Sequence, residues 1–174
     1  RCKAMMTDEG RDLAAKNLKE EGIEGLIVIG GDGSFRGAEE LCKRGILCIG
    51  IPGTIDNDLA YTDYTIGFDT AMNTAMELVD KLRDTSQSHD RCSVVEVMGR
   101  NAGHIAVNTG IACGATDIIT KEVPYDLDAI AKTMLEKKAK GKQNFVVIVA
   151  EGIGHADEIA KVLQEKTHIE TRAT

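Results

Sequence analysis

Residues 26–35 read LIVIGGDGSF, and the rest of the chain is interpreted outward from this stretch. The four apolar residues 26–29 predict a short strand that is covered on both faces of a sheet. A glycine-rich turn follows at 30–33, and the composition of 34–43 favours a helix. A buried strand that leads through such a turn into a helix is typical of α/β folds with parallel sheets.

The same alternation of strand-like and helix-like segments continues along the chain. Further strands are expected at 46–51, 92–97, 116–120 and 145–150, and further helices at 8–21 (after the N-cap Thr7), 70–83, 103–112, 126–140 and 157–166, with a long loop at 52–67. Two helices carry apolar stripes at helical spacing, made of Ala71, Ala75, Leu78, Val79 and Leu82 in one and of Leu127, Ile130, Ala131, Met134 and Leu135 in the other. The chain is therefore predicted to be an α/β protein with mainly parallel sheets.

Composition narrows the classes of function. The 174 residues carry a net charge of -7, which argues against broad nucleic-acid binding. No apolar run approaches the ~20 residues that span a bilayer, so we expect no membrane partner. The chain has five cysteines: Cys2, Cys42, Cys48, Cys92 and Cys113. Their spacing does not resemble that of a metal site, and we expect them to be buried, reduced thiols of a cytoplasmic protein.

The turn at 30–34 is the first candidate for a ligand site. Glycines allow the backbone to approach a phosphate closely, and the start of a helix offers free N–H donors. The carboxylate of Asp32 could bind Mg²⁺ that bridges phosphate oxygens. The alternative is an ordinary tight turn in which Asp32 is a solvated cap.

Two further loops follow predicted strands and carry charged side chains. Residues 52–58 read PGTIDND, in which the two close carboxylates, Asp56 and Asp58, suit a proton acceptor. Residues 98–103 read MGRNAG, in which Arg100 could hold a phosphate with its planar donors. A polar turn and a surface arginine are the alternatives. Because the carboxyl ends of parallel strands share one edge of a sheet, we expect Asp32, Asp56 and Arg100 to converge on one phosphoryl-transfer site.

Three long stretches resemble the ATP-dependent 6-phosphofructokinase family, bacterial type. They are GGDGSFRGAEEL (30–41), GIPGTIDNDLAYTDYTIGFDTA (50–71) and RCSVVEVMGRNAGH (91–104), and the similarity runs to the terminal ETRAT. Lipid and NAD kinases share a GGDG loop but lack the additional acid Asp56 and the MGRNAGH block. The resemblance implies two Rossmann-like α/β lobes, incomplete at both ends of this chain: 1–67 as part of the ATP-binding lobe with the catalytic loop, and 68–174 as the fructose 6-phosphate lobe.

The resemblance also implies roles for individual residues in the transfer of the γ-phosphoryl group from ATP to the C1 hydroxyl of fructose 6-phosphate. Asp56 would be the base, assisted by Thr54, Asp58 and Arg100. The sugar phosphate would be bound by Thr54, Ile55, Asp56, Arg91, Met98, Gly99, Arg100, Glu151 and Arg172, of which Arg91 and Arg172 would reach a neighbouring subunit's ligand. ATP would be bound by Arg1, Cys2, Gly31, Asp32, Gly33 and Ser34, with Asp32 as the ligand of Mg²⁺.

Donor, regulation and assembly are further expectations from the resemblance. Gly33 and Gly53 favour ATP, because pyrophosphate-using relatives carry Asp and Lys there. Bacterial relatives bind an effector such as ADP or phosphoenolpyruvate with basic residues that match Arg83, Lys140 and Lys142, although a glutamate expected at Thr116 is missing. The full-length protein would be a homotetramer, and this stretch alone is expected to be inactive. The alternatives are a kinase for another phosphosugar, a pyrophosphate-using relative, and a non-catalytic regulatory module of the same fold.

Overall fold

The computed structural model describes residues 3–87 and 89–174, and it divides into two compact units. The first unit comprises the chain up to Thr54 together with Asp58–Ile66, and the second comprises Ile55–Asn57 and Gly67–Thr174. The short segment Ile55–Asn57 therefore packs with the second unit, although its neighbours in sequence belong to the first. Arg1 and Cys2, which the resemblance assigns to ATP binding, lie outside the described residues.

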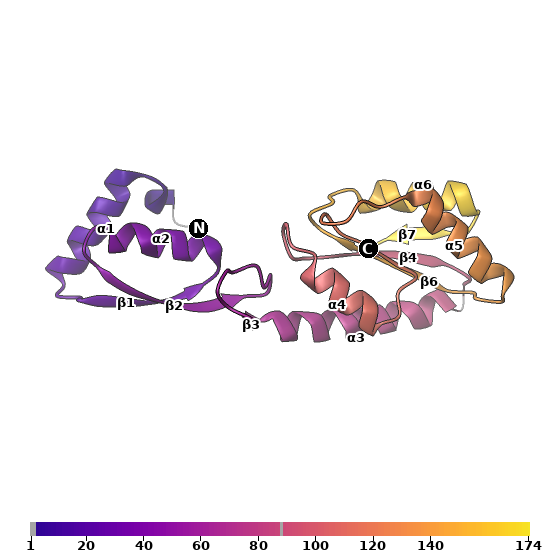
Figure 1. Ribbon diagram of the computed structural model, residues 1–174, viewed down its shortest axis with the longest axis horizontal. Coiled ribbons are helices and arrows are strands. Elements are labelled where there is room, and N and C mark those ends of the chain that lie inside the picture. Colours follow the sequence, from indigo (N-terminus) through magenta and orange to yellow (C-terminus); the bar gives the residue numbers. More distant parts are fainter. Residues whose placement is uncertain (1–2, 88) are drawn as a thin grey trace. The chain divides into compact units, whose positions relative to one another are not determined.

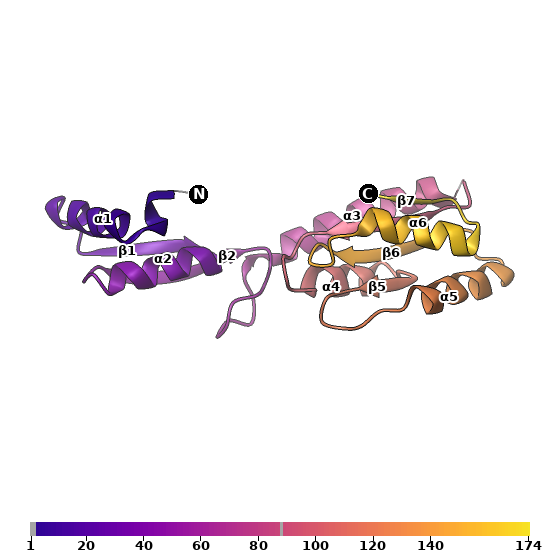
Figure 2. The ribbon, with the colours of Figure 1, turned by 90° about the horizontal axis from the view of Figure 1, so that it is seen from above.

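The first unit is a small sheet with helices on one face. In chain order its elements are the 3-10 helix η1 (Lys3–Met6), α1 (Asp8–Glu20), β1 (Gly25–Gly30), α2 (Asp32–Cys42), β2 (Leu47–Thr54) and β3 (Ile66–Gly67), with strand order β1-β2-β3. Thr7 caps α1 as predicted, since its hydroxyl accepts a hydrogen bond from the Gly10 N–H at 3.2 Å. Figure 2 shows α1 and α2 alongside each other beside the parallel strands β1 and β2.

The prediction that the strand at 26–29 is covered on both faces is wrong. Ile27 and Ile29 are each 69% exposed, and Leu47 and Ile49 on β2 are exposed in the same way. The cause is that both helices of this unit pack on the face that carries Leu26, where a small core forms around Ala15, Leu41 and Ile46. No described helix of the first unit covers the opposite face. Four consecutive apolar residues could not distinguish a strand with one covered face from a strand with two.

The second unit is a four-stranded parallel sheet with helices on both faces. Its elements are α3 (Phe68–Gln87), β4 (Cys92–Val97), α4 (His104–Ala112), β5 (Asp117–Ile119), α5 (Leu127–Ala139), β6 (Phe145–Ala150), α6 (Ala156–Thr167) and β7 (Thr171–Ala173). The strand order is β5-β6-β4-β7, and every neighbouring pair is parallel. Figure 1 shows α5 and α6 on one face of this sheet and α3 and α4 on the other. This arrangement confirms the predicted α/β class.

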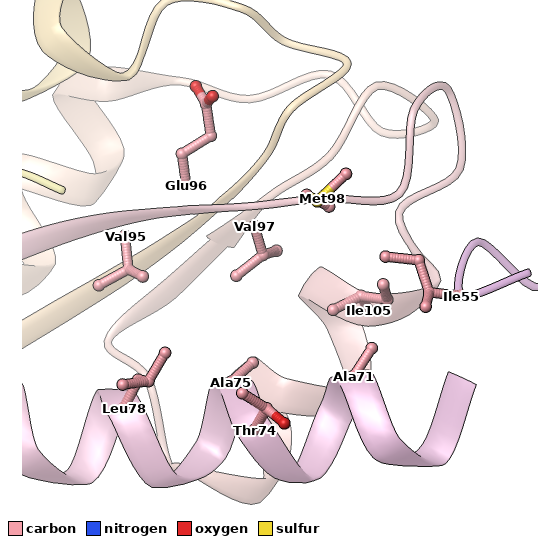
Figure 3. Close-up of a pocket in the computed structure, with 10 residues that line it drawn as sticks. All are labelled: Ile55, Ala71, Thr74, Ala75, Leu78, Val95, Glu96, Val97, Met98 and Ile105. Atoms are coloured by element: carbon pink, nitrogen blue, oxygen red, sulfur yellow. The ribbon is translucent and has the colours of Figure 1, made fainter. Parts of the chain in front are cut away.

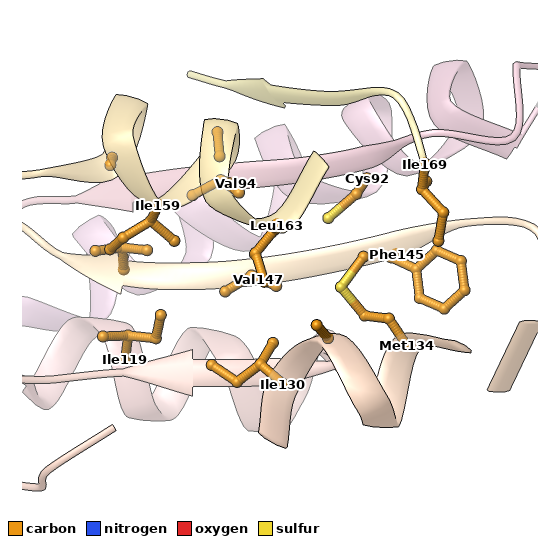
Figure 4. Close-up of a cluster of buried hydrophobic side chains, with 14 residues drawn as sticks. Cys92, Val94, Ile119, Ile130, Met134, Phe145, Val147, Ile159, Leu163 and Ile169 are labelled. Atoms are coloured by element: carbon orange, nitrogen blue, oxygen red, sulfur yellow. The ribbon is translucent and has the colours of Figure 1, made fainter. Parts of the chain in front are cut away.

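Two hydrophobic cores sandwich this sheet because successive side chains of a strand point to opposite faces. On β4, Val94 joins the core under α5 and α6, whereas Val95 joins the core under α3 and α4. The first of these cores appears in Figure 4, where Met134 and Leu163 from the two helices meet the strand side chains. Every residue of β6 is buried, as expected for a central strand that is covered on both faces of the sheet.

Several sequence-based expectations are corrected in detail. The strand predicted to end at residue 51 continues to Thr54, so the loop expected at 52–67 begins later. The helix expected at 70–83 is longer, Phe68–Gln87, and Leu78 of its predicted stripe is 54% exposed, while Val79 is fully buried. In the same way, Leu135 of the other stripe is 43% exposed. The elements η1 and β7 had not been predicted, because segments of three or four residues carry too little periodicity to be recognised.

The cysteines agree only partly with the prediction. Cys42, Cys48, Cys92 and Cys113 are free thiols, and the last two are buried. Cys42 is exposed at the end of α2, so its predicted burial is wrong. A helix position faces the core or the solvent according to its angle around the axis, and a single cysteine does not reveal that angle. Among the described residues, no helix is long and apolar enough to cross a bilayer.

Candidate functional site

The loop that carries Arg100 has an unusual backbone. It leaves β4 at Val97 and enters α4 at His104. Gly99 has a φ of 142°, and Arg100 adopts the left-handed region with a φ of 53°, which side chains other than glycine rarely occupy. A turn closed by the Ala102 N–H and the Gly99 carbonyl at 3.0 Å fixes this reversal. The strained conformation is held by the surrounding structure, as is common where side chains are placed for function.

Arg100 and Asp56 form an ion pair within the second unit. The Nε atom of Arg100 lies 3.2 Å from Oδ2 of Asp56, whose residue is only 5% exposed, while the Arg100 side chain is 47% exposed. Asp56 reaches this position because the preceding Ile55 packs against the core under α3 and α4. A buried carboxylate is costly without a counter-charge, so the guanidinium both stabilises Asp56 and turns its own outer edge toward solvent.

A second carboxylate holds the backbone of the same loop. Oε1 of Glu151 accepts a hydrogen bond from the Arg100 N–H at 2.6 Å. Val97 pairs with Ala150 in the sheet register, so Met98 and Glu151 both begin loops at the same level. The next residue, Gly152, has no room for a side chain, because a Cβ atom there would lie 2.5 Å from the Arg100 carbonyl oxygen. The contact shows that Glu151 supports Arg100, a role that the sequence had not indicated.

The glycine-rich turn lies in the first unit, at the amino end of α2. Gly31 is the N-cap and makes no side-chain capping bond, and its carbonyl accepts from the N–H groups of Ser34 and Phe35. Asp32 is the first helical residue, and its Oδ2 atom lies 2.9 Å from the guanidinium of Arg36 one turn on. Such a helix start offers N–H donors and a positive dipole end to an anion.

Thr54 stands next to this turn at the end of β2. A Cβ atom added to Gly31 would approach the Thr54 Cβ atom to 3.2 Å, which is tighter than an ordinary van der Waals contact, so the two residues pack closely. Around Gly33 the space is open, because an added Cβ would meet no atom within 4 Å. At Gly53 an added Cβ would lie 2.9 Å from Cγ2 of Ile29, so Gly53 serves the packing of the two strands.

Of the three charged residues expected to converge, the structure brings two together. Asp56 and Arg100 meet in the second unit, as described, whereas Asp32 belongs to the first unit, and its approach to the pair stays a prediction. In the chain that the structure describes, no group of three or more His, Cys, Asp or Glu side chains could hold a metal ion. Asp32 is thus a single carboxylate, which suits an ion whose other ligands are phosphate oxygens and water.

Arg91 and Arg172 lie at the opposite edge of the second sheet. Arg91 precedes the first residue of β4, and Arg172 pairs in register with Ser93, so both lie toward the amino ends of the strands. Glu170 binds both arginines, with its Oε2 atom 2.8 Å from Arg91 Nε and its Oε1 atom 2.9 Å from an Arg172 terminal nitrogen. The hydrogen bond from Arg91 is the main cause that lowers the pKa of Glu170. The structure therefore separates these two arginines from Arg100 by the length of β4.

Two of the three basic residues assigned to an effector site are close enough to repel each other. Burial lowers the pKa of Lys142, and the charges of Lys137 and Arg83 lower it further. Lys142 also lies 5.8 Å from the ring centre of Phe145, and Arg83 donates a hydrogen bond to the Cys113 carbonyl. The third residue, Lys140, is the C-cap of α5. An anion bound beside these neighbouring cations would reduce their mutual repulsion.

The second unit also has an open hollow of about 340 Å³ between α3 and β4 (Figure 3). Its lining is almost entirely apolar and includes Met98, which the resemblance assigns to substrate binding: Ile55, Ala71, Thr74, Ala75, Leu78, Val95, Glu96, Val97, Met98 and Ile105. Figure 3 shows Glu96 on the side of β4 that is turned away from the helix. Such a lining cannot neutralise a phosphate, so the hollow is not itself a phosphate site, although it shares Met98 with the loop that carries Arg100.

The second unit pairs the buried Asp56 with a half-exposed Arg100, and the first unit has a glycine-rich helix start; each is a feature of α/β proteins that bind phosphates at strand ends. The comparisons with known proteins specify the family. The family model described as phosphofructokinase matches residues 1–174, and the chain belongs to the phosphofructokinase family. It is 59% identical over all 174 residues to a Clostridium botulinum (strain Hall) protein named ATP-dependent 6-phosphofructokinase. The chain spans 54% of the length of that relative.

Solved structures agree with this assignment. The phosphofructokinase of Saccharomyces cerevisiae matches with a TM-score of 0.88 and 34% identity, over 100% of this chain and 27% of the yeast chain. That of Pichia pastoris in its T-state matches with a TM-score of 0.90 and 36% identity, over 100% of this chain and 21% of the other. The predicted phosphofructokinase-like fold is confirmed.

Proposed function

We propose that this chain is part of an ATP-dependent 6-phosphofructokinase, which transfers the γ-phosphoryl group of ATP to the C1 hydroxyl of fructose 6-phosphate. The observation that carries the proposal is the buried Asp56 carboxylate 3.2 Å from Arg100 Nε, on strand-end loops of a family member. In the reaction the C1 oxygen forms a bond to the γ-phosphorus, the bond from that phosphorus to the ADP oxygen breaks, and the hydroxyl proton passes to Asp56. The name of the curated relative supports ATP as the donor.

Asp56 acts as the proton acceptor in this proposal. Burial keeps the Asp56 carboxylate away from bulk water. The preceding residue, Ile55, packs against the core under α3 and α4, and this packing fixes the position of Asp56. A base placed within reach of a substrate hydroxyl contributes roughly 10²–10⁴-fold to a rate. Thr54 and Asp58 flank the base in sequence and orient the sugar and the phosphates.

Arg100 binds the transferred phosphoryl group. The transition state of phosphoryl transfer spreads negative charge over the equatorial oxygens, and a planar guanidinium can contact two of them. Because one face of Arg100 pairs with Asp56 and the side chain remains 47% exposed, donors are left for an incoming oxyanion. Met98 and Gly99 shape the backbone beside it, and Ile55 contributes with Asp56 to the sugar site.

The ATP phosphates bind at the amino end of α2. Gly31, Gly33 and Ser34 present the backbone there, and the open space beside Gly33 leaves room for a nucleotide. Asp32 would hold Mg²⁺, exchanging its ion pair with Arg36 for the metal. Bound there, Mg²⁺ offsets negative charge on the phosphate oxygens. The preference for ATP over pyrophosphate rests on Gly33 and Gly53.

Other residues belong to the assembled protein in this proposal. Arg91 and Arg172, held together by Glu170 at the opposite edge of the sheet, bind the 6-phosphate in a neighbouring subunit of a homotetramer. Glu151 reaches the sugar hydroxyls with the oxygen that does not bind Arg100. The basic group of Arg83, Lys140 and Lys142 receives an anionic effector such as ADP or phosphoenolpyruvate.

The experiment uses the longer protein that contains this chain. It is incubated with ATP labelled at the γ-phosphate and with a panel of phosphosugars and nucleosides, and the product is identified by phosphorus NMR. Transfer of the label to C1 of fructose 6-phosphate is the expected result. Faster transfer to another acceptor, transfer from pyrophosphate but not from ATP, or binding of both ligands without transfer would contradict the proposal.

A further inference from the structure

We infer that Glu122 is a positioning residue that holds the loop of Arg100 from the end of β5. Its Oε1 atom accepts a hydrogen bond from the backbone N–H of Gly103 at 2.7 Å. Gly103 closes the loop and is the N-cap of α4. The inference rests on the proposed function, since it concerns the residue that binds the transferred phosphoryl group, and it adds a residue to which no role has been assigned above.

Both partners of the hydrogen bond between Gly103 and Glu122 are closely packed. Gly103 makes no side-chain capping bond of its own, and a Cβ atom there would lie 2.7 Å from Cγ2 of Thr120 and 2.9 Å from Oε2 of Glu122. The backbone of the loop is therefore pressed against the segment that follows β5, and only glycine fits. In a capping box, a glutamate three residues into the helix binds the N–H of the N-cap. Here the glutamate comes from a distant loop and does the same.

Electrostatics favour the charged form of Glu122. The hydrogen bond from the Gly103 N–H is the largest cause that holds the pKa of Glu122 below its ordinary value, and His104 contributes a smaller effect. The carboxylate also stands at the amino end of α4, where the helix dipole attracts an anion. Glu122 is thus ionised at neutral pH and binds the N–H group as a charge-assisted acceptor.

A neighbouring contact ties the middle of the loop to the same segment. Lys121 Nζ lies 3.0 Å from Oδ1 of Asn101, the residue after Arg100. Three hydrogen bonds therefore hold the loop, at Arg100, Asn101 and Gly103. Their partners lie in the segments that follow β5 and β6. Because β5, β6 and β4 are successive strands of the sheet, the two carboxylates restrain the loop from its neighbours' strand ends.

These restraints bear on chemistry through Arg100. Its left-handed φ is unfavourable for a residue with a side chain, so the loop would relax if its anchors were released. Relaxation would move the guanidinium away from Asp56 and from the phosphoryl group. A misplacement of about 1 Å in a catalytic group can cost on the order of 10²-fold in rate.

The test compares three variants of Glu122 in the longer protein. Glu122→Ala removes the acceptor, Glu122→Asp keeps the charge but shortens the reach, and Glu122→Gln keeps the reach but removes the charge. Glu136→Ala on α5 is the matched control at an exposed position. The readouts are kcat, the KM values for ATP and for fructose 6-phosphate, and amide hydrogen exchange across residues 100–104.

We expect Glu122→Ala and Glu122→Asp to lower kcat by about 10- to 100-fold with little change in KM for ATP, and to speed exchange at 100–104. Glu122→Gln should recover most of the rate and the protection. If Glu122→Ala does not fold, the Asp and Gln variants carry the comparison. The inference would be overturned if the Glu122→Asp variant had the same kcat and the same amide exchange as Glu136→Ala. A longer protein that shows no transfer to fructose 6-phosphate would instead reject the proposed function, while the exchange measurement would still decide the role of Glu122 in the loop.

Discussion

The guanidinium Nε of Arg100 lies 3.2 Å from Oδ2 of Asp56, and the two residues come from different loops of the chain. The pair brings a cation for phosphoryl oxygens next to a carboxylate that can accept a proton. Because Asp56 is buried and Arg100 is half exposed, the carboxylate depends on the arginine for its counter-charge, while the arginine keeps donors for a ligand. This pair is the structural basis of the predictions on catalysis.

Replacing Arg100 tests the cationic half of the pair. We expect Arg100→Ala in the longer protein to lower kcat by at least ~10²-fold, because a donor that acts on charge developing in the transition state is lost. Arg100→Lys should remain well below the unmodified rate, since a single ammonium cannot contact Asp56 and a phosphoryl oxygen in the same planar arrangement. Steady-state kinetics with saturating ATP provides the measurement. Lys161→Ala, an exposed cation on α6, is the control, and equal rates for the three variants would refute the role of Arg100.

Gly33 tests the site proposed for ATP. The space beside it is open and its backbone is unstrained, so Gly33→Asp should fold normally. The new carboxylate would face the nucleotide phosphates, and like charges at a binding site raise KM for ATP by at least about tenfold. Gly37→Asp, the same change one turn later on α2 and also in open space, is the matched control. Unchanged KM for ATP in Gly33→Asp would place the nucleotide elsewhere.

The sequence predicted the parts of the site that lie in single loops. The glycine-rich turn, Asp56 and Arg100 were recognisable because each follows an apolar strand, and the long similar stretches gave them roles. The contacts of Glu151 with Arg100 and of Glu122 with Gly103 were not recognisable. They form because the sheet order places β6 next to β4 and β5 beyond β6, and strand order cannot be read from local patterns. The only signal in the sequence was a glutamate shortly after each of two predicted strands.

The fold shows the same limit. Sequence patterns predicted the α-helices α1, α2, α4, α5 and α6 to within two residues at each end, but they did not reveal which strand faces would be covered. The apolar run of β1 has two exposed isoleucines because α1 and α2 share one face of that sheet. Similarly, Glu170 joins Arg91 to Arg172 across the start of β7, a strand too short to be predicted.

Thiol reactivity should separate the cysteines by burial. Burial raises the pKa of Cys92 to about 12, so at pH 8.5 this thiol stays protonated and does not attack an alkylating agent. Cys42 is exposed and should react with iodoacetamide under the same native conditions. Mass spectrometry of the peptides gives the extent of modification at each site. Native alkylation of Cys92 as fast as that of Cys42 would contradict the packing of β4.

The core beneath α5 and α6 should account for a large part of the stability of the second unit. Leu163 is fully buried in that core, so Leu163→Ala should lower the free energy of unfolding by about 2–5 kcal/mol. Leu135→Ala makes the same chemical change at a side chain that is 43% exposed, and it should cost no more than about 0.5 kcal/mol. Urea unfolding followed by circular dichroism measures both, and equal losses would mean that Leu163 is not a core residue.

The proton acceptor is tested most directly by the rate of phosphoryl transfer in Asp56→Asn. Asparagine fills the same space but cannot take the proton from the C1 hydroxyl, so turnover should fall by at least ~10²-fold while ATP still binds. Asp84→Asn, an exposed carboxylate on α3, controls for the change itself. The measurement is the initial rate of fructose 1,6-bisphosphate formation by the longer protein, with ATP binding measured by calorimetry on the same samples. A rate near that of Asp84→Asn would contradict the assignment of Asp56 as the base.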